Sequence, residues 1–287
     1  MYYESLSGAP KLAVFESDGI FAVTQKNVTL EIHERVAILT LNRPDVLNSL
    51  NETLAREARE ALAQVRENSS LRALIVTGAG RAFCAGAELN DELADSNEHQ
   101  SAGQRLNATM LDYFNPWITD LDSLQIPVIA AINGVAAGAG VGLALAADIT
   151  LAARSASFIL SFAPKLGLVP DLGTTWRLPK RIGQARAMAL SLLGNKLDAQ
   201  TAADWGMIWQ CVEDDELLNV AMKTAQALAR SPAHAVLEVR RALRLAETND
   251  LKQQLDYERE RQCQLVEKPT FKEGVSAFKE KRLPVFD

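Results

Sequence analysis

Cysteine and histidine are scarce in this sequence, with three of each among its 287 residues. The cysteines are odd in number and widely spaced, which excludes a disulfide framework and does not match the paired spacing of a zinc site. The histidines are equally scattered and form no pattern of metal ligands. We therefore expect free thiols and no bound metal.

Positive charge is also limited, because 30 lysines and arginines face 36 acidic residues and leave a net charge of −6. This balance argues against a broad surface for nucleic acid or membrane. No apolar run is long enough to cross a bilayer, and the N-terminal residues lack the basic-then-apolar order of a signal peptide. We expect a cytoplasmic protein that binds neither nucleic acid nor membrane.

The composition is otherwise that of a globular protein, with 48% hydrophobic and 23% charged residues. Short apolar strands alternate with helical patterns through the middle of the chain, which indicates α/β architecture. We predict an N-terminal extension at 1–26, a core at 27–210 that carries the functional site, and a helical region at 211–287.

The stretch 127–148, PVIAAINGVAAGAGVGLALAAD, organises the rest of the chain. Its β-branched start predicts a buried strand, two glycine turns follow, and the small residues from Leu143 to Ala147 suit a tightly packed helix. Unpaired N–H groups at a helix start attract negative charge, either a phosphate or an oxygen that becomes negative during a reaction. Taken alone, the stretch is better explained by close packing of a helix on a sheet.

A second stretch, 71–89 (LRALIVTGAGRAFCAGAEL), repeats this plan. We predict a strand at 73–77, a glycine turn, and a helix that opens over residues 84–87. Two such turns can aim two backbone N–H groups at one point, which is the requirement of an oxyanion hole.

The motifs TGAGRAFCAGAEL and NGVAAGAGVGLALAAD together resemble the crotonase (enoyl-CoA hydratase/isomerase) superfamily, and the resemblance runs from about Asn27 to the C-terminus. It implies a spiral of ββα units with a C-terminal helical region that builds a trimer or a dimer of trimers. It also implies an acyl-CoA thioester substrate. No separate cofactor is implied, because CoA is part of that substrate.

The resemblance places the two oxyanion-hole donors at the backbone N–H groups of Ala87 and Ala139. It also implies a CoA site that lies mostly along backbone. The implied contacts are Val46, Leu47, Asn48, Ala85 and Leu89, joined by Phe278 and Lys281 from the C-terminal end of a neighbouring subunit.

The proton carrier distinguishes the branches of this family. Hydratases use two glutamates, but the first matching place is Gly142 here and the second falls near Ala163 or Pro164, none of which can move a proton. Asp171, in LGLVPDLGTTW, matches the working aspartate of several other branches. A carboxylate in a dry acyl pocket would have a raised pKa and could carry a proton between carbons. The plainer interpretation of Asp171 is a loop or helix cap after a proline.

The surrounding sequence is most similar to the branch that opens ring epoxides of phenylacetyl-CoA in phenylacetate degradation. We therefore expect an acyl-CoA isomerase that works through a stabilised thioester enolate, with Asp171 as proton shuttle. Two alternatives share the fold, namely Δ3–Δ2 enoyl-CoA isomerisation and hydration by Asp91 or Glu92. A third is an acyl-CoA-binding or assembly protein without turnover.

Overall fold

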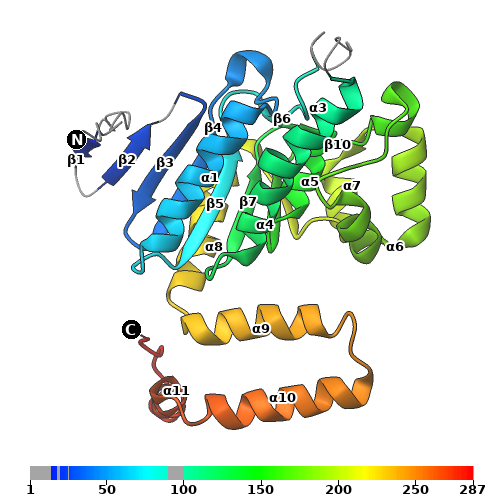
Figure 1. The fold of residues 1–287 in the computed structure, drawn as a ribbon. Helices are drawn as coiled ribbons and strands as arrows, with labels where there is room; N and C mark the ends of the chain where they lie inside the picture. The colour runs from blue at the N-terminus through cyan, green and yellow to red at the C-terminus, as the bar shows by residue number, and fades with distance from the viewer. Residues whose placement is uncertain (1–13, 18–19, 25, 90–99, 287) are drawn as a thin grey trace, which may run out of the picture.

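The structure is a computed structural model that describes residues 14–17, 20–24, 26–89 and 100–286. Strands and helices alternate along most of the chain and build two sheets with helices packed around them (Figure 1). The predicted α/β class is therefore confirmed.

The larger sheet has eight strands, antiparallel from the first to the fourth and parallel from there on. Residues 28–41 form an antiparallel hairpin within this sheet. In spatial order the strands are β1 (Val14–Ser17), β2 (Ile20–Thr24), β3 (Val28–His33), β4 (Val36–Leu41), β5 (Ala73–Gly78), β7 (Val128–Ile132), β9 (Ile149–Ala153) and β12 (Gln210–Val212).

The smaller sheet has four strands in the order β11 (Leu197–Asp198), β10 (Ser157–Ile159), β8 (Val135–Ala137) and β6 (Ala82–Cys84). Each of the pairs β5–β6, β7–β8 and β9–β10 places its first strand in the larger sheet and its second in the smaller one. A helical segment follows each pair. This repetition is the spiral of ββα units that the family resemblance implies.

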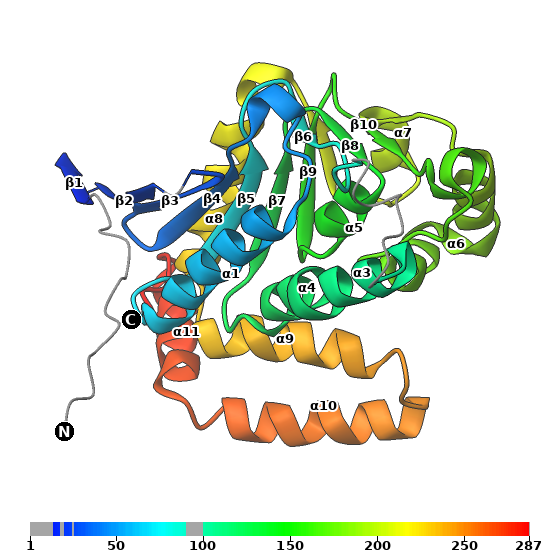
Figure 2. The ribbon, with the colours of Figure 1, turned by 45° about the horizontal axis from the view of Figure 1, so that its top comes forward.

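Helices cover both faces of the larger sheet (Figures 1 and 2). The helix α1 begins after a side-chain cap, since the Asn51 side chain accepts a hydrogen bond from the Leu54 amide. Besides α1 (Glu52–Glu67), the core carries η1 (Pro44–Val46), α3 (Ala102–Thr109), η2 (Met110–Phe114), α4 (Asn115–Ser123), α5 (Ala139–Leu145), η3 (Phe162–Leu166), α6 (Thr174–Leu193), α7 (Ala199–Asp204), η4 (Asp214–Glu216) and α8 (Leu217–Ala229).

Three further helices, α9 (Ala233–Leu245), α10 (Leu251–Leu265) and α11 (Pro269–Glu280), lie together below the core (Figure 1). Within the region predicted at 211–287, α8 packs against β5 and β7 and so belongs to the core. At the other end, β1 and β2 continue the larger sheet beyond β3, so the sheet crosses the boundary predicted at residue 27.

The helix predicted to open at Cys84 to Ala87 is wrong. The strand β6 ends at Cys84, and Ala87 forms a parallel bridge with Leu50. The Leu50 amide donates to the Gly86 carbonyl at 2.7 Å, and its carbonyl accepts from the Glu88 amide at 2.8 Å. Pairing of Ala87 with a distant segment therefore keeps these residues out of a helix. The other predicted helix exists as α5, but it begins at Ala139, earlier than the small-residue run that was taken to form it.

No helix within the described ranges is both long enough and apolar enough to span a membrane.

Candidate active site

The two glycine-rich turns lie directly against each other. A Cβ atom placed on Gly86 would lie 2.9 Å from the Ala137 carbonyl oxygen and 3.5 Å from the Ala139 nitrogen. Gly86 also has φ +97°, a conformation that side chains disfavour. The fold therefore brings together the two segments that the sequence motifs single out.

The Ala87 amide is free to meet a ligand. In this parallel bridge, Leu50 forms its hydrogen bonds with Gly86 and Glu88, the two neighbours of Ala87. The Ala87 N–H therefore points away from Leu50. Within the described part of the chain, this N–H donates to no acceptor.

The Ala139 amide is available for a different reason. Ala139 is the first residue of α5, and an N–H in the first turn has no partner inside its helix. The cap residue before it is Gly138, at φ 51° and ψ −126°, which offers no side chain to accept this bond. No other described residue accepts from it either. Ala87 and Ala139 thus present, from neighbouring turns, two backbone donors that have no acceptor among the described residues.

The start of α5 packs tightly on β6 next to these donors. A Cβ atom on Gly140 would lie 2.3 Å from the Cys84 carbonyl oxygen, so glycine is required there. Burial, with a smaller contribution from the charge of Asp171, raises the pKa of the Cys84 thiol to about 12, although a backbone hydrogen bond at Gly86 opposes the rise. The thiol is therefore neutral. The turn that carries Asp171 packs against α5, because a Cβ atom on Gly142 would lie 3.0 Å from the Asp171 carbonyl oxygen.

Asp171 lies in a four-residue turn that leads into α6, closed by a 2.9 Å hydrogen bond from the Thr174 amide to the Asp171 carbonyl. Burial raises the pKa of its carboxyl from 3.8 to about 6. Its Oδ1 atom is buried and has no hydrogen-bond partner among the described residues. This carboxyl can change charge near neutral pH, as a proton carrier must.

The place of the first hydratase glutamate cannot hold a side chain in this structure. A Cβ atom on Gly142 would lie 2.7 Å from Leu172 Cβ, 2.8 Å from Thr174 Oγ1 and 3.0 Å from the Asp171 carbonyl oxygen. The threonine hydroxyl that fills this place could not be found from the sequence, since nothing in the local pattern marks it. A glutamate at 142 would require the turn at 171–174 to move.

Glu88 is the acidic residue directly after the first donor, but its carboxylate is already engaged. Arg43 donates to it at 2.7 Å and Asn51 at 3.1 Å, so both hold the side chain in place. The loop acids Asp91 and Glu92 lie outside the described residues.

The segments expected to hold CoA run side by side. The Ala85 amide donates to the Leu47 carbonyl at 3.0 Å, and Val46 and Leu89 are 42% and 63% exposed. Asn48 is fully buried, and its side chain bonds only to backbone. Its backbone amide also donates to the Arg43 carbonyl at 2.9 Å, so Asn48 shapes this loop. A cavity of about 450 Å³ opens beside Ala87, between Leu50 and residues 100–114.

Phe278 and Lys281 lie elsewhere in the chain. They lie at the end of α11. Both views show α11 below the core, whereas β6 and α5 lie within the core (Figures 1 and 2). Phe278 is 85% exposed. The fold does not bring these two residues to Ala87 within one chain, so a contact with CoA would have to be made in a neighbouring subunit.

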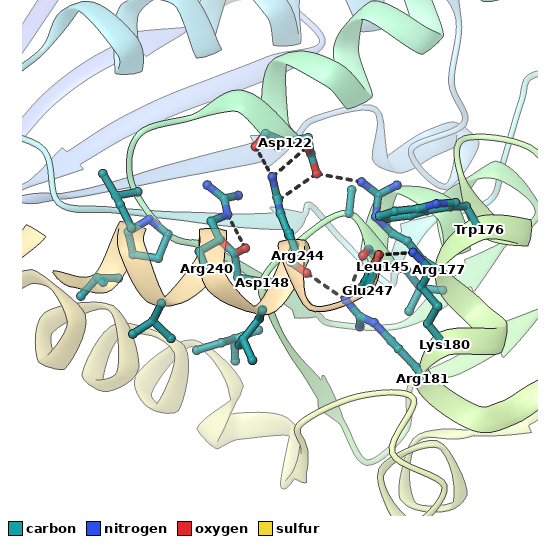
Figure 3. Close-up of a pocket in the computed structure, with 18 of the residues that line it drawn as sticks. Asp122, Leu145, Asp148, Trp176, Arg177, Lys180, Arg181, Arg240, Arg244 and Glu247 are labelled. Atoms are coloured by element: carbon teal, nitrogen blue, oxygen red, sulfur yellow. Dashed lines mark hydrogen bonds and ion pairs between the residues drawn. The ribbon is translucent and has the colours of Figure 1, made fainter. Parts of the chain in front are cut away.

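A second cavity, of about 620 Å³, lies between α6, α9 and the C-terminal end of α5 (Figure 3). Ion pairs cross it and join α9 to the core, as Asp122 accepts from Arg177 at 3.0 Å and from Arg244 at 2.9 Å. Arg240 pairs with Asp148 at 2.7 Å. None of the predicted site residues lines this cavity. We interpret this cavity as part of the contact that holds α9 on the core.

The described residues contain no cluster of three or more His, Cys, Asp or Glu side chains that could hold a metal ion.

Comparison with known proteins shows the family. The family model described as enoyl-CoA hydratase/isomerase matches residues 31–287. The chain is 47% identical to the 1,2-epoxyphenylacetyl-CoA isomerase of Escherichia coli K12, over 89% of this chain and 96% of that protein. It is 41% identical to a probable enoyl-CoA hydratase of Rhodobacter capsulatus, over 90% of this chain and 97% of that protein.

A solved structure shares the fold of this chain. The enoyl-CoA hydratase from Bacillus anthracis superposes with a TM-score of 0.83 at 34% identity, covering 91% of this chain and 98% of the other.

Proposed function

This chain belongs to the enoyl-CoA hydratase/isomerase family, and on that premise we propose that it is an acyl-CoA isomerase. The proposed reaction runs through a thioester enolate. The proposed acyl group resembles the ring epoxide of phenylacetyl-CoA, supported by the 47% identity to a 1,2-epoxyphenylacetyl-CoA isomerase. Homologues named as hydratases make hydration the second candidate.

The thioester oxygen would lie between the amides of Ala87 and Ala139. Both N–H groups lack an acceptor in the described chain, and the second lies at the positive end of a buried helix. As the enolate forms, negative charge develops on this oxygen. One fixed donor of this kind typically lowers the barrier by about 3 kcal/mol.

Asp171 would carry the proton. Above pH 6 its carboxylate can accept a proton from one carbon, and its burial keeps water from competing before the proton is returned to another. The observation that carries the proposal is this pairing of a buried acid at 171 with a glycine at 142 that leaves no room for glutamate. One proton carrier suffices for isomerisation, whereas hydration by paired carboxylates needs two.

We further propose that the helices α9–α11 assemble the chain into a trimer or a dimer of trimers. These helices bury a single residue, Ala277, within one chain. They nevertheless expose large apolar side chains, including Val239, Leu243, Leu251, Leu255, Phe271 and Phe278. In such an assembly Phe278 and Lys281 could reach the CoA of a neighbouring subunit.

Exchange of the substrate α-proton in deuterated water tests the proposal, because exchange reports enolate formation whatever the product. We expect the wild-type protein to exchange at least one member of a panel of acyl-CoAs that includes phenylacetyl and enoyl thioesters. The Asp171→Asn variant should lose about 10²–10⁴-fold in exchange rate while acyl-CoA affinity is retained.

Two outcomes would contradict this function. Unchanged turnover in Asp171→Asn, with water added to an enoyl-CoA, would favour hydration by another acid. Acyl-CoA binding without exchange or turnover of any panel member would favour a binding protein.

A further inference from the structure

The turn that presents Asp171 has an unusual backbone. Its two central residues, Leu172 and Gly173, both have positive φ, 49° and 76°, and the Thr174 amide closes the turn on the Asp171 carbonyl. This is the pattern of a type I′ turn, which glycine and asparagine favour and leucine rarely adopts. Such a turn brings its first and fourth residues, Asp171 and Thr174, next to each other.

Both of these residues carry a buried polar atom without a partner. Thr174 is fully buried, and its Oγ1 has no hydrogen-bond partner among the described residues. The Oδ1 atom of Asp171 is in the same condition. A buried hydroxyl that stays unpaired is destabilising, so a hydroxyl at this place calls for a partner. Asp171, which begins the same turn, carries an acceptor that also lacks a donor among the described residues.

The surroundings offer few competing groups. Gly142 on α5 faces the turn, with Thr174 Oγ1 only 2.8 Å from where its Cβ would be, and contributes no side chain. Cys84 on β6 is the titratable group that senses the Asp171 charge, and its thiol is neutral. Arg177 on α6 lies over Gly173, but its guanidinium is engaged by Asp122 at 3.0 Å.

We propose that Thr174 is the positioning residue of Asp171, and that its hydroxyl donates a hydrogen bond to the Asp171 carboxylate, through one bound water in the rotamers of this structure or directly after a rotation of either side chain. This inference rests on the proposed function for its catalytic meaning, since it assigns a partner to the proposed proton carrier. The bond fixes the orientation of the carboxylate and favours its charged form. It therefore sets the pH at which Asp171 becomes a base.

A direct titration of the carboxyl tests the inference without any substrate. The protein is labelled with ¹³C at aspartate carboxyls, and the Asp171 signal is identified by its loss in Asp171→Asn. In Thr174→Val, which keeps the shape of the side chain but removes the hydroxyl, the Asp171 pKa should rise by roughly 0.5 to 1 pH unit. In Thr174→Ser, which keeps the hydroxyl, it should stay at the wild-type value.

Exchange kinetics provide a second measurement. The acidic limb of the pH profile for α-proton exchange should move upward in Thr174→Val with little change in KM, and Thr174→Ser should restore it. A wild-type carboxyl titration retained in Thr174→Val overturns the inference, as does a Thr174→Ser variant that behaves like Thr174→Val.

If the variants do not fold, the wild-type protein still allows a test. A high-resolution crystal structure should show Thr174 Oγ1 bonded to the Asp171 carboxyl or to a water that bridges them. A hydroxyl bonded only to a backbone carbonyl would overturn the inference. Absence of exchange in the wild-type protein would instead count against the proposed function and leave the titration result standing.

Discussion

The carboxyl of Asp171 and that of Glu273 differ in the direction of their pKa shifts. Burial raises the pKa of Asp171 to about 6, whereas hydrogen bonds from Arg282 and from the Val285 amide lower the pKa of Glu273 to about 2. A lowered pKa indicates a carboxylate whose charge helps to hold the fold. A raised pKa indicates one whose charge is costly in the folded state. Such a cost is expected at a site kept for chemistry.

This difference predicts that Asp171→Asn makes the protein more stable. Below pH 3.8 the carboxyl is neutral in both folded and unfolded chains, so it costs nothing. As the pH rises through about 6, the folded protein must ionise a buried group, and stability is lost. The gain of Asp171→Asn should reach up to about 3 kcal/mol at pH 8 and about half of that at pH 5. Denaturant unfolding at the two pH values measures it.

Glu273→Gln provides the contrasting control. Its carboxylate contributes stability that is present above the ordinary pKa of 4.5 and lost as the pH falls through about 2, so the variant should be less stable than wild type at pH 8. A gain in Asp171→Asn that does not depend on pH would contradict the assignment of a raised pKa to Asp171.

At the scale of single elements, α5 leads to a prediction about glycine. All seven of its residues are buried, and a Cβ atom at Gly142 would lie within 3.0 Å of three atoms of the 171–174 turn. Gly142→Ala should therefore destabilise the protein by about 1–3 kcal/mol, since the turn has to shift to accept a methyl group. Denaturant unfolding measures this loss, and the shifted turn should also slow exchange.

The matched control is Gly274→Ala on α11, where a Cβ atom would meet nothing within 4 Å. There the substitution should stabilise the protein by about 0.5–1 kcal/mol, because alanine favours a helix more than glycine does. If Gly142→Ala proves as stable as wild type, position 142 has room for a side chain, and the argument against a hydratase glutamate fails.

The elements differ in how far the sequence could predict them. The strands β3, β4, β5 and β7 follow from local alternation or short apolar runs, and the start of α1 follows from the Asn51 cap. The conformation around Ala87 could not be predicted in this way. It depends on pairing with Leu50, which lies in a distant segment. A local run of small residues is compatible with a helix and with an extended segment, so it does not distinguish the two.

The residues of the candidate site also differ in how far the sequence could predict them. Residues Ala87, Ala139 and Asp171 are implied by the family resemblance rather than by spacing, and they remain predictions about function. The fold brings the first two together, and it packs the turn of Asp171 against α5, the helix that begins at Ala139. The proposed role of Thr174 could not be predicted from the sequence, because it rests on a buried hydroxyl without a hydrogen-bond partner among the described residues. Burial of that kind depends on tertiary packing.

At the scale of the whole molecule, the C-terminal helices contrast with the core. The core α1 buries its apolar face, including Leu54 and Leu62, against the sheet. The helices α9 and α10 bury no residue, and ion pairs such as Asp122 with Arg244 tie α9 to the core (Figure 3). These pairs are partly exposed, and exposed pairs contribute little stability. Ion pairs alone therefore do not explain why these helices are ordered.

The proposed assembly accounts for this region and predicts the effect of a charge within it. Leu251 and Leu255 lie one turn apart on α10, and they are 75% and 55% exposed in a single chain. If they pack against another subunit, Leu255→Glu places an unpaired charge in an apolar contact and should convert the trimer or hexamer to monomer. Sedimentation velocity measures the change in mass. Activity should fall with it, provided that Phe278 and Lys281 serve a neighbouring site.

The same charge placed at a polar position separates packing from electrostatics. Gln264→Glu adds one negative charge to α10 without removing an apolar side chain, so its assembly should match wild type. A wild-type protein that sediments as a monomer contradicts the assembly outright. Dissociation by both variants would mean that added charge, and not loss of apolar contact, breaks the interface, since burial of Leu255 would then not be what holds the subunits together.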